Sequence, residues 1–395
     1  MDNPVGGCPT HGWQTRRARS RRMISCSSDA GPQSMITLRA ASVLLISSIS
    51  AIAQIDDGPH LFHRPDGSVE AVWIEKSVVK RQSFKKDAPV VLPRFAHLIG
   101  PELRLAEHKP ETATYPMPEK MLVISDVEGR YDEIMRFLKA NGVIDAKGQW
   151  AYGKGHLVTV GDMVDRGEQV TEVLWLMYRL SAEARKAGGR VHFVLGNHEV
   201  MIMGGDIRYI APKYAAVVTL LKTPYPDLVG KDSEIGRWLR ARNALVRVGD
   251  YLFVHAGISP QLDLAKGSFE TLNGQIRSVT GIPLTQVATV ADLPSRIMGW
   301  GRQGILWYRG YFPQYAADFG PRPESAQIDA ILKMFGAKTM VIGHTKVAYP
   351  TFIYDRRRVL AIDTPWTDLP NVRGLLVEGD KAFFVDVNGK RTPSS

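Results

Sequence analysis

The chain has 395 residues, an apolar content of 44% and a formal net charge of +10. This composition excludes an intrinsically disordered chain and allows one large domain or two ordinary ones. Residues 1–53 contribute four of the positive charges, because they hold six arginines against two aspartates. The excess in the remainder is mild, so we expect no nucleic acid among the partners.

The first 53 residues are predicted to be a leader outside the fold. From about residue 35 to 53, MITLRAASVLLISSISAIA combines Arg39, a short apolar run and a small-residue ending, which is typical of a cleaved signal peptide. The apolar run is too short and too rich in serine for a comfortable membrane span, and an uncleaved anchor is the alternative. Both cysteines, Cys8 and Cys26, precede the cleavage site. We therefore expect a periplasmic or secreted protein with no stable membrane span after cleavage.

Residues 54–118 are predicted to form an N-terminal hairpin followed by a wrapping segment. The stretch LFHRPDGSVEAVWIE carries two β-prone runs around the turn residues Pro-Asp-Gly at 65–67. Residues 76–118 are mixed, basic and proline-bearing, and we expect them to wrap around the remainder of the protein. The domain that carries the chemistry is expected at 119–390.

From residue 119 onward, short apolar runs alternate first with amphipathic helices and later with hairpins. This order predicts an α/β fold, a two-sheet β-sandwich flanked by helices, in a single catalytic domain. The predicted strands are MLVIS (121–125), HLVTV (156–160), VHFVL (191–195), ALVRV (244–248), YLFVH (251–255) and TMVIG (339–343), followed by the pairs TFIYD with VLAID and GLLVE with AFFVDV. The predicted helices are YDEIMRFLKAN (131–141) and EQVTEVLWLMYRLSAEARKA (168–187).

Two further stretches, 205–221 and 233–246, are predicted to be helical and to cap the crevice at the strand ends. A cap in this position would set the choice of substrate. Tyr209, in the first stretch, is expected to be a solvated helix residue, with a substrate contact as the alternative.

Five of the predicted strands end on side chains that commonly bind metals. In α/β folds, ligands collect at the carboxyl ends of strands, and oxygen and imidazole donors suit Mn, Fe or Zn. Any one of these residues alone is more often a hydrogen-bonded turn residue than a ligand. Five such strand ends together, with tight glycine turns, predict one shared site. The residues are Asp126, Glu128, Asp162, Asp165, Asn197, His198, His255 and His344.

Four segments carry a resemblance to a known family. GDMVDRG (161–167), LGNHE (195–199), VHAGI (254–258) and IGHT (342–345) resemble the motifs of the calcineurin-like binuclear metallophosphoesterases. They are most similar to the phosphoprotein-phosphatase branch, including its bacterial Shewanella-like type, and the resemblance spans about 120–390. It implies two central β-sheets flanked by helices, two divalent metal ions, and hydrolysis of a phosphomonoester by a metal-bridging hydroxide. The substrate would be a phosphate ester, either a small molecule or a phosphoprotein.

The first motif departs from the family pattern G-D-x-H-G, because Glu128 stands where a histidine is usual. Residues two apart in a strand face the same way, so we expect Asp126 and Glu128 to reach one cation. The alternative is that Glu128 only accepts a hydrogen bond and leaves the first metal site weak or empty. The resemblance implies metal ligation by Asp126 and Glu128 at the first ion, by Asp162 at both ions, and by Asn197, His255 and His344 at the second.

The exchange of histidine for a carboxylate changes the charge of the expected centre. Three carboxylates and one hydroxide would neutralise two divalent ions. We therefore expect a hard ion, with Mn favoured, Mg, Fe and Zn possible, and Mg or Mn preferred over Zn at the first position.

The resemblance also implies the roles of residues that are not metal ligands. His198 would protonate the leaving alkoxide, and Asp165 would orient it by a charge-assisted hydrogen bond. Arg166 would bind phosphate oxygens bidentately. Arg309, in GILWYRG (304–310), is the candidate for the second arginine that is usual in this family. The match around it is loose, and the alternative is a surface arginine beside packed aromatic residues.

Two other functions remain open at the level of sequence. A dinucleoside-polyphosphate or nucleotide hydrolase of the same superfamily would share these motifs. A non-catalytic binding protein could keep the fold after losing the first metal through Glu128. Retention of the other motif residues argues against such a degenerate site.

Overall fold

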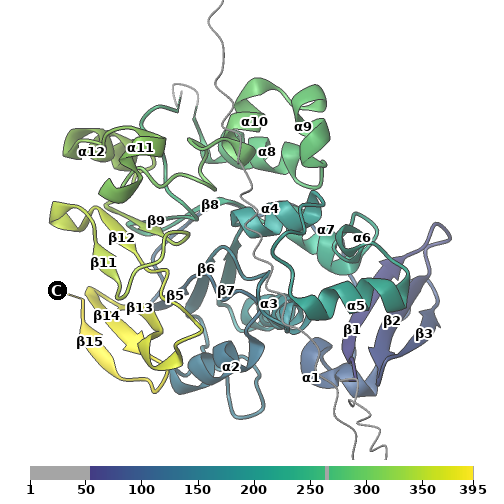
Figure 1. Ribbon diagram of the computed structural model, residues 1–395. Coiled ribbons are helices and arrows are strands. Elements are labelled where there is room, and N and C mark those ends of the chain that lie inside the picture. Colours follow the sequence, from purple (N-terminus) through teal and green to yellow (C-terminus); the bar gives the residue numbers. More distant parts are fainter. Residues whose placement is uncertain (1–53, 263–266, 395) are drawn as a thin grey trace, which may run out of the picture. The chain divides into compact units, whose positions relative to one another are not determined.

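The computed structural model describes residues 54–262 and 267–394, and all statements below refer to these (Figure 1). The predicted leader 1–53, its signal peptide at about 35–53 and both cysteines lie outside the described residues. The described chain contains two six-stranded sheets and one three-stranded sheet. Among these residues no helix is both long and apolar enough to cross a membrane.

The first large sheet holds the strands that precede the first three motifs. Its order is β15-β14-β13-β5-β6-β7. The strands β5, β6 and β7 run parallel in one half, and three antiparallel strands form the other. Their bounds are β5 Lys120–Ile124, β6 His156–Val160, β7 Arg190–Val194, β13 Arg373–Glu378, β14 Lys381–Asp386 and β15 Arg391–Pro393.

The second large sheet holds the strands that precede the last two motifs. Its order is β11-β12-β10-β9-β8-β4, with β9, β10 and β12 parallel and the hairpin of β8 and β9 antiparallel. Their bounds are β4 Thr114–Tyr115, β8 Leu245–Val248, β9 Tyr251–Val254, β10 Thr339–Ile342, β11 Thr351–Phe352 and β12 Val359–Ala361.

The two sheets pack face to face around one apolar layer. Alternate residues of β5, Met121 and Val123, point into this layer, as do Val246 and Val248 of β8 and Phe253 of β9. All five are buried, and the period of two along each strand is what a two-sided sheet requires. The α/β prediction, with two sheets flanked by helices, is confirmed.

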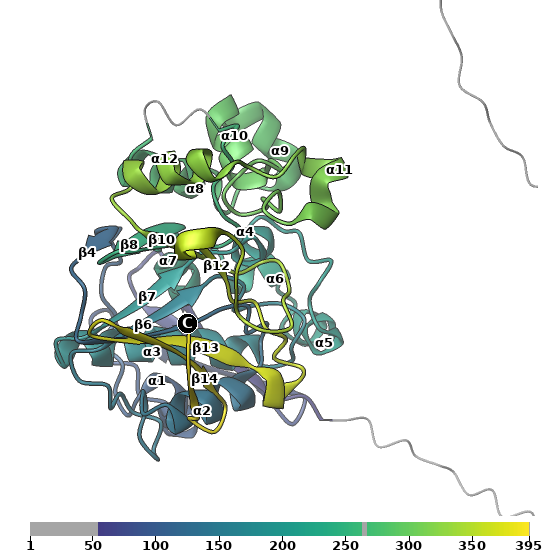
Figure 2. The ribbon, with the colours of Figure 1, turned by 90° about the vertical axis from the view of Figure 1, so that its left-hand side faces the viewer.

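Helices cover the outer faces of this sandwich. In both views, α8 to α12 lie beyond the second large sheet, and α1 to α3 lie on the opposite side, beneath the first (Figures 1 and 2). Their bounds are α1 Ala96–Ile99, α2 Tyr131–Ala140, α3 Val170–Lys186, α8 Phe269–Val279, α9 Leu284–Val290, α10 Leu293–Trp300, α11 Ala316–Phe319 and α12 Ser325–Met334. In α3, Glu172 in the first turn and basic residues in the last turn complement the helix dipole.

Two helix predictions are wrong in their bounds. In 205–221, only α5 Pro212–Leu221 is helical, because Pro212 favours the first helical position and Tyr209 lies in the turn before it. In 233–246, α7 Glu234–Arg240 begins at the cap residue Ser233, and the stretch then continues into β8. Between β7 and β8 the chain also forms α4 Asn197–Met203 and α6 Tyr225–Leu228.

The N-terminal region is a sheet of three strands, not a two-stranded hairpin. Strands β1 Asp57–His63 and β2 Val69–Glu75 form the predicted hairpin, and β3 Val78–Phe84 adds to it from the segment predicted to wrap. Alternation is weak in β3 because most of its side chains are exposed, which explains why the pattern missed it.

Candidate metal centre

The turns that follow the strands hold the candidate ligands in an unusual backbone conformation. Asp126, Glu128, Asp162 and His344 have φ values of +52°, +53°, +53° and +63°. Side chains other than glycine reach this region at a cost, and they stay there only when the surrounding structure determines it. The first two turns hold each other, since the amides of Asp126 and Glu128 donate to the carbonyls of Gly161 and Asp162 at 3.0 Å.

The physical argument that joined Asp126 to Glu128 in the sequence is therefore wrong. Strand β5 ends at Ile124, so the alternation of a strand does not apply to either residue. Tight turns place both carboxylates instead. Close approach demands glycine nearby: a Cβ on Gly196 would lie 2.2 Å from Asp162 Oδ1.

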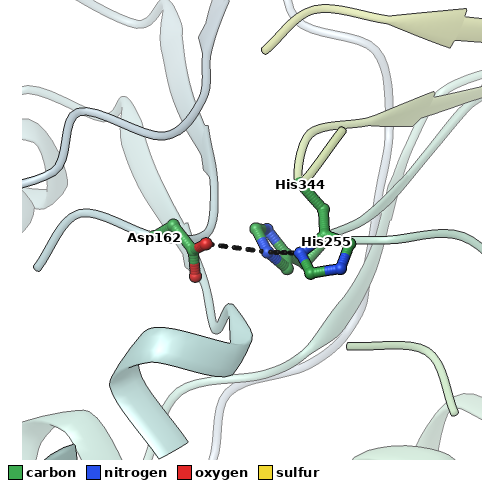
Figure 3. Close-up of side chains that lie close together, drawn as sticks. All are labelled: Asp162, His255 and His344. Carbon is green, nitrogen blue, oxygen red and sulfur yellow. Dashed lines mark hydrogen bonds and ion pairs between the residues drawn. The ribbon is translucent and has the colours of Figure 1, made fainter. Parts of the chain in front are cut away.

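Asp162, His255 and His344 come together at the sandwich edge, with candidate ligand atoms within 4.8 Å of one another (Figure 3). The Nδ1 of His255 donates to the carbonyl of Val160 at 2.7 Å, which leaves Nε2 with a lone pair when the ring is neutral. That Nε2 lies 3.1 Å from Asp162 Oδ2, 3.0 Å from Asn197 Oδ1 and 3.2 Å from His344 Nδ1. Four atoms with lone pairs thus face one another.

The charge balance of this cluster favours a cation. Burial lowers the pKa of His255, but the carboxylate of Asp162 outweighs it and raises that pKa to about 9. Burial would raise the pKa of Asp162, yet His255 and His198 hold it well below its usual range. The carboxylate of Asp162 thus favours positive charge in this cluster, and one proton can serve only one of the facing acceptors.

Several buried polar atoms around the cluster have no hydrogen-bond partner among the described residues. They are His344 Nε2, Asp165 Oδ1 and Asp363 Oδ1. Buried polar atoms are rarely left unpaired, and oxygen and imidazole donors are the ligands of Mn, Fe and Zn. The residues present thus fit a divalent metal centre.

Asp126 lies against the His344 turn on the other side of the cluster. Both of its carboxylate oxygens accept from the His344 amide at 3.2 Å, and one accepts from the Ser125 hydroxyl. Burial raises the pKa of Asp126 well above its usual value, and the charge of Asp363 adds to this effect. Buried carboxylates that raise the pKa of one another in this way again favour a bound cation.

Glu128 is engaged by two basic side chains. Its Oε1 forms an ion pair with Arg166 and lies 3.4 Å from Lys346 Nζ. The carboxylate is buried, whereas both basic partners reach solvent. If Glu128 binds a metal, as the sequence predicts, its carboxylate would have to contact the metal in addition to Arg166 and Lys346.

His198 and Asp165 lie side by side, as their predicted roles require. His198 Nδ1 lies 2.6 Å from Asp165 Oδ2, and its Nε2 lies 3.7 Å from Asp162 Oδ2, on the side of the metal ligands. Burial lowers the pKa of His198, but the charges of Asp162 and Asp165 outweigh burial and raise it. The ring is thus held in one orientation with a tendency to carry a proton.

Both predicted arginines lie at the site. The guanidinium of Arg309 donates to the His344 carbonyl at 2.9 Å and to Thr345 Oγ1 at 3.1 Å, so it is not a free surface arginine. The guanidinium of Arg166 lies 5.3 Å from the ring centre of Tyr209, whose ring also packs against His198 at 5.1 Å. Tyr209 thus packs against both His198 and Arg166.

Sequence reasoning missed two buried carboxylates. Asp363 follows β12, and its pKa is raised to about 7 by burial, against the opposing charge of Lys346. Glu199 accepts from the amides of Gly196, Asp162 and Met163 at 2.7, 3.0 and 2.8 Å, and it thereby ties two of the turns together. VLAID, which ends on Asp363, carries the same strand-end signal as the five motifs, so that residue could have been found.

Comparison with known proteins places this geometry in a family. Residues 119–348 match the family model of the calcineurin-like phosphoesterases. Shewanella-like protein phosphatase 2 of Arabidopsis thaliana is 24% identical over 275 residues, which cover 58% of this chain and 67% of that protein. A symmetrical bis(5'-nucleosyl)-tetraphosphatase of Neisseria meningitidis is 31% identical over 153 residues, 38% of this chain and 48% of that protein.

A solved structure agrees over a greater length. The cold-active protein-tyrosine phosphatase of a psychrophilic Shewanella species superposes with a TM-score of 0.76 and 34% identity, covering 86% of this chain and 99% of that one. The family uses divalent metals, and the lone pairs around His255 provide a place for them. The chain therefore belongs to the calcineurin-like phosphoesterases, and it is a metal-dependent hydrolase with the metallophosphoesterase fold.

Proposed function

We propose that the chain is a phosphatase that hydrolyses phosphomonoesters at this centre, including esters on proteins. The observation that carries the proposal is the convergence of Asp162, Asn197, His255 and His344, with their lone pairs facing one another, beside the His198–Asp165 pair. This combination supplies both a cation site and a proton donor. A binding protein has no use for a proton donor beside its metal site, so we set the non-catalytic alternative aside.

The protein's own side chains then have separate tasks. Two divalent ions, when bound, would supply an activated water molecule and neutralise charge on the phosphoryl group. His198 Nε2 lies on the side of Asp162 and would give its proton to the leaving oxygen, while Asp165 keeps the ring oriented through Nδ1. Arg166 and Arg309 would bind the phosphoryl oxygens, because both guanidinium groups border the site.

We propose manganese as the preferred metal. Carboxylates outnumber imidazoles around the expected first ion, where Asp126, Asp162 and Asp363 are buried together and Glu128 lies beside them. Hard oxygen donors favour Mn²⁺ or Mg²⁺ over Zn²⁺. Metal analysis of protein refolded in an equal mixture of the three ions tests this, and a product that holds only zinc would overturn it.

Phosphoprotein substrates are supported by the two relatives with the longer matches, a Shewanella-like protein phosphatase and a protein-tyrosine phosphatase. The second candidate is hydrolysis of dinucleoside polyphosphates. It is supported by the Neisseria tetraphosphatase, although that match spans about half of the relative.

We further propose that the mature enzyme works outside the cytoplasm. The support is the arginine-led apolar run with a small-residue ending at 35–53. Expression of the full chain in a bacterium, followed by cell fractionation and N-terminal sequencing, tests this. A full-length protein in the cytoplasmic fraction would contradict it.

The decisive experiment for the reaction is a substrate panel with the metal-loaded enzyme. The panel contains phosphotyrosine and phosphoserine peptides, p-nitrophenyl phosphate and diadenosine tetraphosphate. We expect turnover of the monoesters with Mn²⁺ and a loss of about 10²-fold or more in His198→Asn. Turnover of the dinucleotide alone would favour the second candidate, and no turnover at all would refute the proposal.

A further inference from the structure

A third basic side chain, Lys346, lies at the metal centre with Arg166 and Arg309, and the reaction described so far does not use it. Lys346 follows the candidate ligand His344 by two positions, and its ammonium nitrogen lies 3.4 Å from Oε1 of Glu128. The same carboxylate oxygen forms an ion pair with the guanidinium of Arg166. One buried carboxylate thus holds two cations together.

The backbone around Lys346 is held on both sides. Before it in the chain, Thr345 is buried, and its hydroxyl oxygen accepts a hydrogen bond from Arg309 at 3.1 Å. After it, the amide of Val347 donates to the carbonyl of Asp363 at 2.9 Å. The place of Lys346 is therefore fixed by contacts to two separate parts of the centre.

The two cations reach solvent, whereas the carboxylate between them does not. The side chain of Lys346 is 53% exposed and that of Arg166 is 37% exposed, against 5% for Glu128. A lysine carries three N–H donors and an arginine five, so one shared carboxylate oxygen cannot occupy them all. Both cations therefore keep donors for a ligand that arrives from solvent.

The balance of charge around Glu128 favours an anion. Lys346 and Arg166 bring two positive charges to one carboxylate, which leaves an excess of one. Arg309 adds another, because its guanidinium donates to a carbonyl and a hydroxyl and pairs with no carboxylate among the described residues. The remaining carboxylates of the centre would be neutralised by the metal ions. The excess then matches a phosphoryl group, which carries close to two negative charges at neutral pH.

We propose that Lys346 binds an oxygen of the phosphoryl group, and that Glu128 is the positioning residue that holds Lys346 beside Arg166 for this task. The inference rests on the proposed phosphatase function and adds a third side chain to its phosphate site. A carboxylate suits position 128 for this reason. A neutral imidazole there would offer one acceptor atom and no negative charge, so it would not hold two cations.

Substitution of Lys346 tests the proposal on protein loaded with Mn²⁺. Lys346→Met removes the charge and keeps most of the length of the side chain, whereas Lys346→Arg keeps the charge. In titration calorimetry with inorganic phosphate, we expect binding to weaken about 10-fold in Lys346→Met and less than about 3-fold in Lys346→Arg. Lys338→Met is the matched control. Lys338 is an exposed lysine paired with Asp250 at the opposite end of β10, and its loss should leave phosphate binding unchanged.

Kinetics and metal content distinguish this role from a structural one. With p-nitrophenyl phosphate, Lys346→Met should raise KM about 10-fold and change kcat little, because a cation on a non-reacting oxygen stabilises the bound substrate and the transition state alike. The amount of bound manganese should stay the same. A residue that only supports the fold would instead lower the melting temperature without this division between KM and kcat.

Two results would overturn the proposal: unchanged phosphate binding in Lys346→Met, or a loss in Lys346→Arg as large as that in Lys346→Met. A gain in bound metal at unchanged phosphate affinity would also overturn it, and would show that Lys346 only competes with the metal for Glu128. If the wild type binds phosphate but hydrolyses no ester, the phosphatase function fails. The phosphate titration still decides the role of Lys346 in that case.

Discussion

Two buried clusters in this molecule are built from the same residue types, yet their chemistry differs. At the metal centre, imidazole and carboxylate atoms with lone pairs face one another. Around Glu234 in α7, each carboxylate oxygen instead meets a donor. His63 lies 2.6 Å from Oε2, while His108 and the Tyr178 hydroxyl lie 2.7 Å from Oε1.

The second cluster joins distant parts of the chain. His63 lies in β1, His108 lies between α1 and β4, and Tyr178 lies in α3. Burial would raise the pKa of Glu234, but the hydrogen bonds from His108, His63 and Tyr178 lower it to about 2. A saturated carboxylate of this kind stabilises the fold, and it has no free lone pair to offer a ligand.

The comparison teaches that residue type does not reveal function, whereas hydrogen-bond satisfaction does. Both carboxylate oxygens of Glu234 have hydrogen-bond partners within the protein. His344 Nε2, Asp165 Oδ1 and Asp363 Oδ1 have no partner among the described residues. Unsatisfied buried atoms are costly, and they persist where a ligand completes them. Substitutions in the first cluster should therefore cost metal and activity, and substitutions in the second should cost stability.

The largest effect is expected at the metal centre. Asp162→Asn should lower kcat/KM by at least about 10³-fold and reduce the bound metal, because it removes the charge that the cation pairs with. The melting temperature of the metal-free protein should fall little. Metal analysis and calorimetry measure the two effects. Full metal content in the variant would contradict the assignment of Asp162 as a ligand.

The acid pair should show itself in the pH profile. Asp165 helps to raise the pKa of His198. The proposed reaction uses the protonated ring, so we expect activity to fall as the pH rises through that pKa. Asp165→Asn should lower the pKa, move the alkaline limb of kcat/KM to lower pH, and cost about 10²-fold in rate. His198→Asn is the control and should lose this limb. If the alkaline limb of kcat/KM stays in place in Asp165→Asn, then Asp165 does not set the pKa of His198.

Substitution in the cluster around Glu234 should instead lower the stability of the fold and leave the metal centre intact. Glu234→Gln should lower the free energy of unfolding by about 3 kcal/mol, because it removes the buried charge that is held by three hydrogen bonds, and should leave the bound metal unchanged. Urea unfolding measures this effect. Glu378→Gln, in an exposed pair with Arg391, is the control and should cost under about 1 kcal/mol.

The pH dependence of this stability follows from the lowered pKa. The folded carboxylate titrates near pH 2 and the unfolded one near its ordinary 4.5, so the stabilisation is present above pH 4.5 and is lost as the pH falls towards 2. The wild type should lose stability in this window more steeply than Glu234→Gln. Parallel curves would show that Glu234 does not titrate as inferred.

A smaller effect is expected at Asp363. Its carboxylate is buried near Asp126, and one oxygen has no partner among the described residues. Asp363→Asn should weaken Mn²⁺ binding by about 10- to 100-fold, as measured by titration calorimetry, through the loss of a charge around the metal. Asp380→Asn, in an exposed turn, is the control. Unchanged affinity would place Asp363 outside the centre.

Much of the fold and of the site could be predicted because the signal is local. Each motif follows a buried strand, and parallel strands of one sheet bring their carboxyl ends to one edge, so the donors after β5, β6 and β7 had to meet, as did those after β9 and β10. Local patterns failed where exposure hid them, as in β3, or where a proline set the start of a helix, as at Pro212. The strand argument for Glu128 failed because turns, not strand alternation, place it.

The sequence by itself determined the residue types at the centre, the family, and the two-sheet architecture. Only the tertiary structure decided what each donor meets: Glu128 with Arg166 and Lys346, Arg309 with the His344 turn, and Asp363 with Asp126. These partners are far apart in the chain, and no spacing rule links them. Their contacts depend on how the two sheets pack, which is a property of the whole core and not of any motif.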